Sequence, residues 1–153
     1  MATQADVRRI ALSFLGAKEA HGHFAFEVLN KGKMKGFVWV WMERVTPKKP
    51  RVPNAGVVAV RVRSLADKDV ILAAEPTKYF TEPHYNGFPA VLVRLDAVAV
   101  ADLKPLIEDA WRCMAPAELT GSSKQGRKAA VAKPPGAKAS KSTRGWRGKP
   151  KRR

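Results

Sequence analysis

Residues 79–95 read YFTEPHYNGFPAVLVRL, and this stretch decides how the second half of the chain folds. Two apolar segments, residues 79–81 and 90–95, stand on either side of the turn segment PHYNG at residues 83–87. Asn-Gly is a common turn dipeptide, because glycine adopts backbone conformations that other residues avoid. The stretch therefore predicts two antiparallel strands joined by a short connection.

The first half of the chain shows the same kind of strand pattern. Apolar residues alternate over residues 24–28, a turn follows at residues 30–32, and a second strand is predicted over residues 37–42. The next segment, residues 46–53, contains three prolines, which lack the N–H group that a central strand needs. We therefore expect a loop there, followed by a third strand over residues 57–62.

Three helices are predicted around these strands. The first begins at the capping pair Thr3 and Asp6, and the second covers residues 64–74 with the same capping logic. The third covers residues 102–114, where Pro105 is tolerated in the first turn. Strands joined by short links, with helices at both ends and in the middle, predict an α+β fold. We expect an antiparallel sheet of about five strands with helices packed on one face.

The same stretch carries a family resemblance. Residues 79–95, followed by Leu103 and the segment from Asp109 to Pro116, resemble the MmcQ/YjbR family of small bacterial proteins. The match covers most of residues 3–119, and its most specific part is the string PHYNGFPAVLVRL. The resemblance implies a fold like the frataxin α/β sandwich, also described as a double wing, and it implies DNA binding without an assigned biochemical activity.

The net charge of +16 is unevenly distributed along the chain. Residues 121–153 hold twelve Lys and Arg residues and none of the 13 Asp and Glu residues, so the preceding part carries only about +4. This segment has almost no large apolar side chain, and it cannot bury enough surface to offset the entropy of ordering. We therefore divide the chain into an MmcQ/YjbR-like domain, residues 1–119, and a disordered basic tail, residues 120–153, which the usual family member lacks.

The tail is predicted to bind nucleic acid, either DNA or RNA, with little dependence on base sequence. Cations spaced by small residues can follow phosphates without a groove of fixed shape, and one tryptophan could stack on a base. An acidic protein is the alternative partner. A membrane surface is disfavoured, because the tail has no amphipathic apolar face. The predicted contact residues are Lys124, Arg127, Lys128, Lys133, Lys138, Lys141, Arg144, Trp146, Arg147, Lys149, Lys151, Arg152 and Arg153.

Within the domain, the turn at His84, Tyr85 and Asn86 presents an imidazole, a phenol and an amide side by side. Functional residues are often found on such loops, which makes the turn a candidate site for a ligand or for catalysis. The alternative is that these residues only brace the connection between the two strands, since turn residues have local hydrogen-bonding roles.

The predicted strand at residues 37–42 is apolar on both faces. Phe37, Trp39 and Trp41 recur at period two, and the residues between them are also apolar. Packing in the core is the favoured interpretation, because large exposed apolar patches are uncommon on monomers. An aromatic platform for single-stranded nucleic acid is the alternative.

Catalytic and metal-binding signals are weak. His21, His23 and His84 could form a three-histidine site, but no dense set of carboxylates or cysteines accompanies them in sequence, so no metal site is predicted. Phosphate-binding glycine loops and hydrolase motifs are missing, which favours a binding protein over an enzyme, and no catalytic residue or cofactor is predicted. Cys113 is the single cysteine, without an identifiable base beside it, and both it and Trp111 are expected to be packing residues.

Cellular location follows from three absences in the sequence. One cysteine permits no intrachain disulfide, the first 20 residues contain charges throughout, and no apolar run is long enough to cross a bilayer. We expect a soluble cytoplasmic protein that could associate with the nucleoid. The sequence does not define the oligomeric state.

Overall fold

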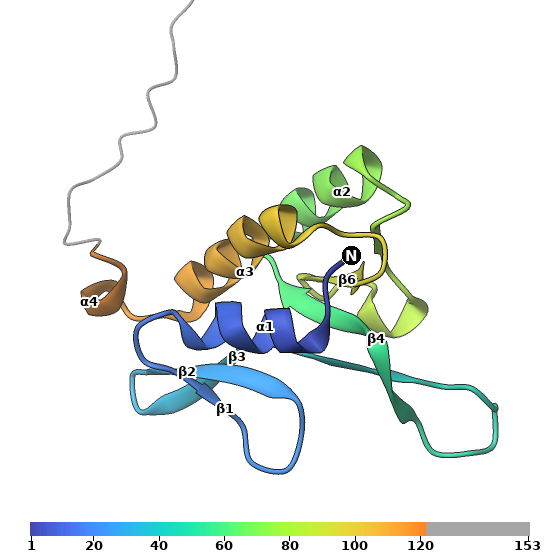
Figure 1. Cartoon of the computed structure of the whole chain (residues 1–153), viewed down its shortest axis with the longest axis horizontal. Coiled ribbons are helices and arrows are strands. Elements are labelled where there is room, and N and C mark those ends of the chain that lie inside the picture. The colour runs from blue at the N-terminus through green and yellow to red at the C-terminus, as the bar shows by residue number, and fades with distance from the viewer. Residues whose placement is uncertain (122–153) are drawn as a thin grey trace, which may run out of the picture. The chain divides into compact units, whose positions relative to one another are not determined.

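The computed structural model describes residues 1–121, which form a six-stranded antiparallel sheet with helices over one face (Figure 1). The strands are β1 (Ala17–Glu19), β2 (Ala25–Asn30), β3 (Lys33–Glu43), β4 (Val52–Arg61), β5 (Tyr79–Phe80) and β6 (Ala90–Arg94). The helices are α1 (Gln4–Leu12), α2 (Leu65–Ala74), the 3₁₀ helix η1 (Pro83–Tyr85), α3 (Val100–Met114) and α4 (Ala117–Thr120). The strand order is β1-β2-β3-β4-β6-β5, which confirms the predicted α+β class.

The first two long helices begin where the capping residues predict. The Thr3 hydroxyl accepts a hydrogen bond from the N–H of Asp6, and the Asp6 carboxylate accepts one from the N–H of Thr3. Ser64 caps α2 in the same way, by accepting from the N–H of Asp67 at 3.1 Å. These bonds satisfy N–H groups that have no partner within the helix, so each cap fixes where its helix starts.

The third helix, α3, begins at Val100, two residues earlier than predicted. Pro105 therefore lies in the second turn instead of the first, where its missing N–H removes one hydrogen bond of the helix. The helix persists because Leu103, Ile107 and Ala110 are fully buried against the sheet. Tertiary packing here outweighs a local preference.

The main hydrophobic core lies between the sheet and the helices α1, α2 and α3 (Figure 1). Along β4 and β6 every second residue faces this core, where α3 packs on β4 and α2 packs on β6. The fully buried side chains include Val7, Phe26, Val58, Val60, Val91, Val93, Leu103 and Ile107. One face of each strand thus meets the helices, as period-two alternation requires.

The predicted loop over residues 46–53 is two residues too long, because its last two residues belong to a strand. β4 begins at Val52, and Pro53 pairs with Met42 of β3. Proline is tolerated at this position because β6, the other neighbour of β4, pairs only with residues 57–61. Pro53 therefore lies on a locally free edge, where no further strand requires its N–H.

The prediction that Phe37, Trp39 and Trp41 share one face of the strand is wrong for Phe37. The register between β2 and β3 shifts at Phe26, so that Phe37 has no partner in the pairing. This bulge turns Phe37 into the helix-covered core together with Val38, and both side chains are fully buried. Only Trp39 and Trp41 remain on the opposite face.

The sixth strand, β1, has no counterpart in the sequence-based prediction. It has three residues, of which Lys18 pairs with Glu27 of β2, and it is too short to show alternation. Gly16 precedes it with a φ of +71°, and a Cβ atom there would lie 2.8 Å from Leu119. The backbone conformation favours glycine at this position, whereas the contacting atom is the end of the flexible Leu119 side chain, which can move aside.

Candidate functional site

The candidate turn lies between β5 and β6, and its three predicted site residues differ in solvent exposure. Tyr85 is buried, whereas His84 and Asn86 are exposed. Asn86 and Gly87 form the centre of a tight turn in which the Phe88 N–H donates to the Tyr85 carbonyl at 3.0 Å. Gly87 has a φ of +75°, which explains the glycine of the Asn-Gly pair.

The buried Tyr85 joins the turn to the sheet. Its hydroxyl accepts a hydrogen bond from Nε1 of Trp39 on β3, at 3.1 Å. Its ring packs on the face opposite the helices, in a cluster with Trp41, Ala59 and Leu92. The bracing interpretation therefore holds for Tyr85, because its polar and apolar atoms are both used internally.

Lys68, on α2, supports the same turn and was not singled out from the sequence. Its side chain is 4% exposed, and its ammonium donates to the carbonyls of Tyr85 at 2.6 Å and Phe88 at 3.1 Å. Burial lowers the pKa of Lys68, and the nearby charge of Asp69 opposes this shift. A lysine in the first turns of a helix looks like any exposed helical lysine, so no sequence signal identified it.

A second hydrophobic cluster lies on this face, which we call the second face of the sheet. It contains Trp41, Val57, Ala59, Tyr85, Ala90 and Leu92, with Trp39 and Phe80 packed at its border. Trp41 is only 9% exposed and meets Phe80 edge to face, with ring centroids 5.7 Å apart. The core-packing interpretation is thus the better one for Trp41, and Trp39 is half-buried beside it.

Residues 81–89, which we call the cover segment, lie over the second face and are held at both ends by charged side chains. Arg51, in the β3–β4 loop, pairs with Glu82 at 3.0 Å and also donates to the carbonyl of Met42. At the other end, the guanidinium of Arg61 lies 4.8 Å from the ring centroid of Phe88. These few contacts hold the cover segment over the second face, with His84 and Asn86 exposed to solvent.

The remaining body residues from the sequence analysis occupy other places. His21 and His23 are exposed in the β1–β2 connection, and within residues 1–121 no three His, Cys, Asp or Glu side chains gather closely enough to hold a metal ion. Trp111 is buried, stacks on Phe14 at 5.3 Å and donates from Nε1 to the Leu15 carbonyl. Cys113 is half-buried, and this burial raises the pKa of its thiol.

Several cations of the domain gather at the two ends of β3. At the β2–β3 turn and in the β3–β4 loop, exposed basic side chains take part in none of the ion pairs formed among the described residues. They are Lys31, Lys33 and Lys35 at one end, and Arg44, Lys48 and Lys49 at the other. Exposed cations without ion pairs thus occur at both ends of β3, and others, such as Lys18 and Lys104, lie elsewhere on the domain.

The predicted nucleic-acid contacts of the tail lie outside the described residues. They are the thirteen positions from Lys124 to Arg153 named above, of which twelve are Lys or Arg and one is Trp146. Over the part of the chain that is described, no helix is both long enough and apolar enough to cross a membrane.

Comparison with known proteins identifies the fold, but the names of the matching proteins describe no function. No family model matches the chain. Uncharacterized protein Rv2570 of Mycobacterium tuberculosis and uncharacterized protein Mb2600 of Mycobacterium bovis are each 44% identical to it over 77 residues, or 50% of this chain. The match spans 60% of the length of these relatives.

A solved structure matches over most of the described domain. The crystal structure of Deinococcus radiodurans protein DR2400, with domain DUF419, covers 81% of this chain and 84% of its own, with a TM-score of 0.55 and 18% sequence identity. DUF419 is the domain of the MmcQ/YjbR family. The chain therefore has the fold of the MmcQ/YjbR family, as the resemblance of residues 79–95 predicted.

Proposed function

We propose that this protein binds nucleic acid with little dependence on base sequence, and that its basic C-terminal segment provides most of the affinity. One observation carries this proposal: residues 121–153 contain twelve Lys and Arg residues and no Asp or Glu. Charged surfaces of folded domains mix both signs, whereas blocks of a single sign are typical of segments that bind polyanions. If the polymer is DNA, such binding would associate the protein with the nucleoid, whereas RNA binding would not.

Counterion release is the physical basis of the expected affinity. Each phosphate that a cation neutralises frees condensed counterions, which contributes about −0.9 to the slope of log K against log salt on duplex DNA. Not all twelve cations need to bind phosphates at the same time. If roughly six to ten of them bind, the affinity falls by ~10³–10⁵ between 50 and 200 mM salt.

The domain supports the proposal through its two basic hairpin ends. Lys31, Lys33 and Lys35 are exposed at one end of β3 and carry charge that no described acidic group neutralises. They add a second, weaker electrostatic contact. Contacts of this kind go to phosphates, and they position a protein on nucleic acid without reading its sequence.

Fluorescence anisotropy with unrelated duplexes and single strands at several salt concentrations tests the proposal. Three proteins are compared: the full chain, a chain in which the twelve basic residues of 121–153 are glutamine, and a K31Q/K33Q/K35Q variant. The tail variant should lose most of the affinity and of the salt slope, and the hairpin variant only a small part. Comparing DNA with RNA of the same sequence determines which polymer is preferred.

Two outcomes reject the proposal. If the tail variant keeps the affinity and slope of the full chain, the tail is not the binding element. If the full chain fails to bind at low salt, the nucleic-acid function fails altogether, and an acidic protein partner becomes the proposal to test.

A further inference from the structure

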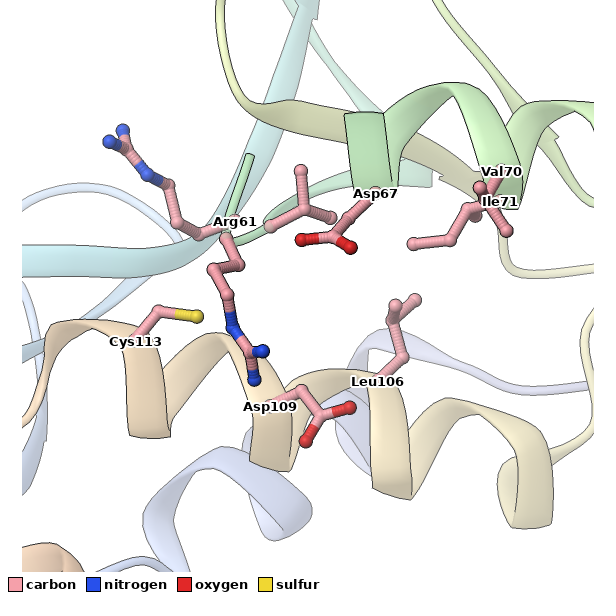
Figure 2. A pocket seen from close by; sticks show the side chains of 9 residues that line it. Arg61, Asp67, Val70, Ile71, Leu106, Asp109 and Cys113 are labelled. Atoms are coloured by element: carbon pink, nitrogen blue, oxygen red, sulfur yellow. The ribbon is translucent and has the colours of Figure 1, made fainter. Parts of the chain in front are cut away.

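A cavity of about 230 Å³ opens between α2 and α3 beside the end of β4 (Figure 2). It lies on the helix side of the sheet. None of its lining residues belongs to the cover segment or to the two basic hairpin ends. Arg61, which also contacts Phe88 of the cover segment, is the one lining residue that the cavity shares with the sites described above.

One wall of the cavity is aliphatic. Val62 directly follows β4, Ile71 comes from α2 and Leu106 from α3. Val62 is 6% exposed, and the other two side chains are half-buried. In Figure 2, Ile71 and Leu106 approach the opening from opposite helices. This wall can shelter a small branched hydrocarbon group from water.

The other wall carries charges of both signs. Asp67 of α2 and Asp109 of α3 contribute carboxylates from opposite sides (Figure 2). Arg63 also lines the cavity and contributes a guanidinium. Arg61 also lines the cavity, but its guanidinium lies against Phe88, so its charge is directed elsewhere.

None of these charged groups is neutralised by a neighbour. Among the described residues, no ion pair involves Arg63, Asp67 or Asp109. Asp67 uses one carboxylate oxygen to accept from the Ser64 hydroxyl, at 2.9 Å, and its other oxygen makes no hydrogen bond there. The thiol of Cys113 adds a neutral group, because burial raises its pKa even though Arg63 is close. All three charged residues are exposed to solvent beside the cavity, and because they form no ion pair they are available to a ligand.

We propose that this cavity binds a small zwitterion with a branched aliphatic body, of the kind represented by a free aliphatic amino acid. The ligand carboxylate bonds to the guanidinium of Arg63, a geometry that allows two parallel hydrogen bonds. Its ammonium lies between Asp67 and Asp109, and its side chain packs on Ile71 and Leu106.

Size and charge both restrict the ligand to this class. Sites for drug-sized molecules measure roughly 300–1,000 Å³, so a cavity of about 230 Å³ fits a smaller molecule. A purely anionic ligand would face two carboxylates, and a purely cationic one would leave Arg63 unused beside an apolar group. A molecule with no net charge that carries a carboxylate, an ammonium and an aliphatic group matches the guanidinium, the two carboxylates and the aliphatic wall of the cavity.

Titration of the full-length protein with leucine, leucinamide and N-acetylleucine tests the assignment. Leucinamide lacks the carboxylate and N-acetylleucine lacks the ammonium. Binding is measured by calorimetry and by the NMR shifts of the Ile71 and Leu106 methyl groups. Leucine should shift the methyl resonances of both residues. Each analogue should bind at least about tenfold more weakly than leucine, because each loses a charge-assisted hydrogen bond. Glycine, which lacks the aliphatic group, should also bind more weakly.

Matched variants localise the binding. R63Q and D109N should each weaken leucine binding about tenfold or more, whereas K104Q and D96N, which remove exposed charges outside the cavity, should leave it unchanged. Circular dichroism confirms that each variant is folded, and the ligand series on the unaltered protein needs no variant at all.

Three results overturn the proposal: no methyl shift with leucine at about 10 mM, leucinamide binding as tightly as leucine, or D96N weakening binding as much as D109N. The second result would make the cavity a cation site. The cavity and the basic tail share no residues, so either proposal can fail without the other.

Discussion

The helix-covered face and the second face of the sheet are both apolar, and they are closed by different means. On the first face, α1 and α3 supply fully buried aliphatic residues along their length, among them Leu103 and Ile107. On the second face, the short cover segment supplies one buried ring, Tyr85, and is held by the contacts of Lys68, Arg51 and Trp39.

Because of this difference, we expect substitutions on the two faces to affect stability in different ways. Aliphatic burial is distributed over many residues and is part of the global stability of the domain. A cover held by a few hydrogen bonds and one ion pair can open locally while the sheet stays folded. The second face is thus the place where local opening and loop-borne function are expected, and the predictions below probe this division.

The largest effect is expected from L103A on the helix-covered face. The side chain is fully buried, and its removal leaves a cavity that costs about 2–5 kcal/mol of unfolding free energy. Urea denaturation measures the loss. L29A is the control, because Leu29 is 55% exposed on β2 and its truncation should change stability by only ~0.5 kcal/mol or less. Equal losses in the two variants would contradict the division between buried and exposed positions.

A smaller and more local effect is expected from K68M. Methionine keeps most of the aliphatic stem but leaves the carbonyls of Tyr85 and Phe88 without the ammonium donor, at a cost of about 1–3 kcal/mol. Hydrogen exchange should accelerate in the cover segment before it does in α3. K104M serves as the control for an exposed helical lysine. Unchanged exchange in residues 81–89 would show that Lys68 does not hold the cover.

Y85F should have a weaker effect again. It removes the acceptor of the Trp39 indole N–H while keeping the ring in the second cluster, which costs about 0.5–1.5 kcal/mol. The indole ¹H–¹⁵N resonance of Trp39 should shift. H84A, on the exposed side of the same turn, should leave both the resonance and the stability nearly unchanged. A comparable loss in H84A would mean that His84 braces the turn as well.

The smallest expected effect is a pH dependence assigned to Lys68. Burial lowers the pKa of Lys68 in the folded protein below its ordinary value of 10.5. Between the two pKa values the unfolded chain binds more protons, so this group makes stability rise with pH in that window, up to about 10.5. The stability of the wild-type protein relative to K68M should therefore increase over the alkaline range. A constant or shrinking difference would contradict the direction of the shift.

Much of the domain could be predicted from local sequence signals. The caps at Thr3 and Ser64, the strand alternation over residues 24–28 and the turn at residues 83–87 each act within a few residues, and the structure confirms the elements that they predict. The wrong predictions concern residues whose placement depends on a neighbouring strand and not on nearby residues in the sequence. Phe37 changes face because of a bulge between two strands, and Pro53 is tolerated because a neighbouring strand ends early.

The candidate site divides in the same way. The sequence drew attention to the turn at His84, Tyr85 and Asn86, but which of the three is buried depends on the distant partners Trp39 and Lys68. The α2–α3 cavity has no signal in the sequence at all.

By itself, the sequence determined where the capped helices and alternating strands occur and how the charge is divided along the chain, because caps, periodicity and charge are properties of neighbouring residues. Only the tertiary structure decided that Lys68 is buried under the turn and that Arg63, Asp67 and Asp109 share one cavity. These arrangements bring Lys68 to Tyr85 and Asp109 to Arg63 and Asp67, across separations that no local sequence pattern spans. Their geometry depends on how α2 and α3 pack on the sheet, which no local pattern records.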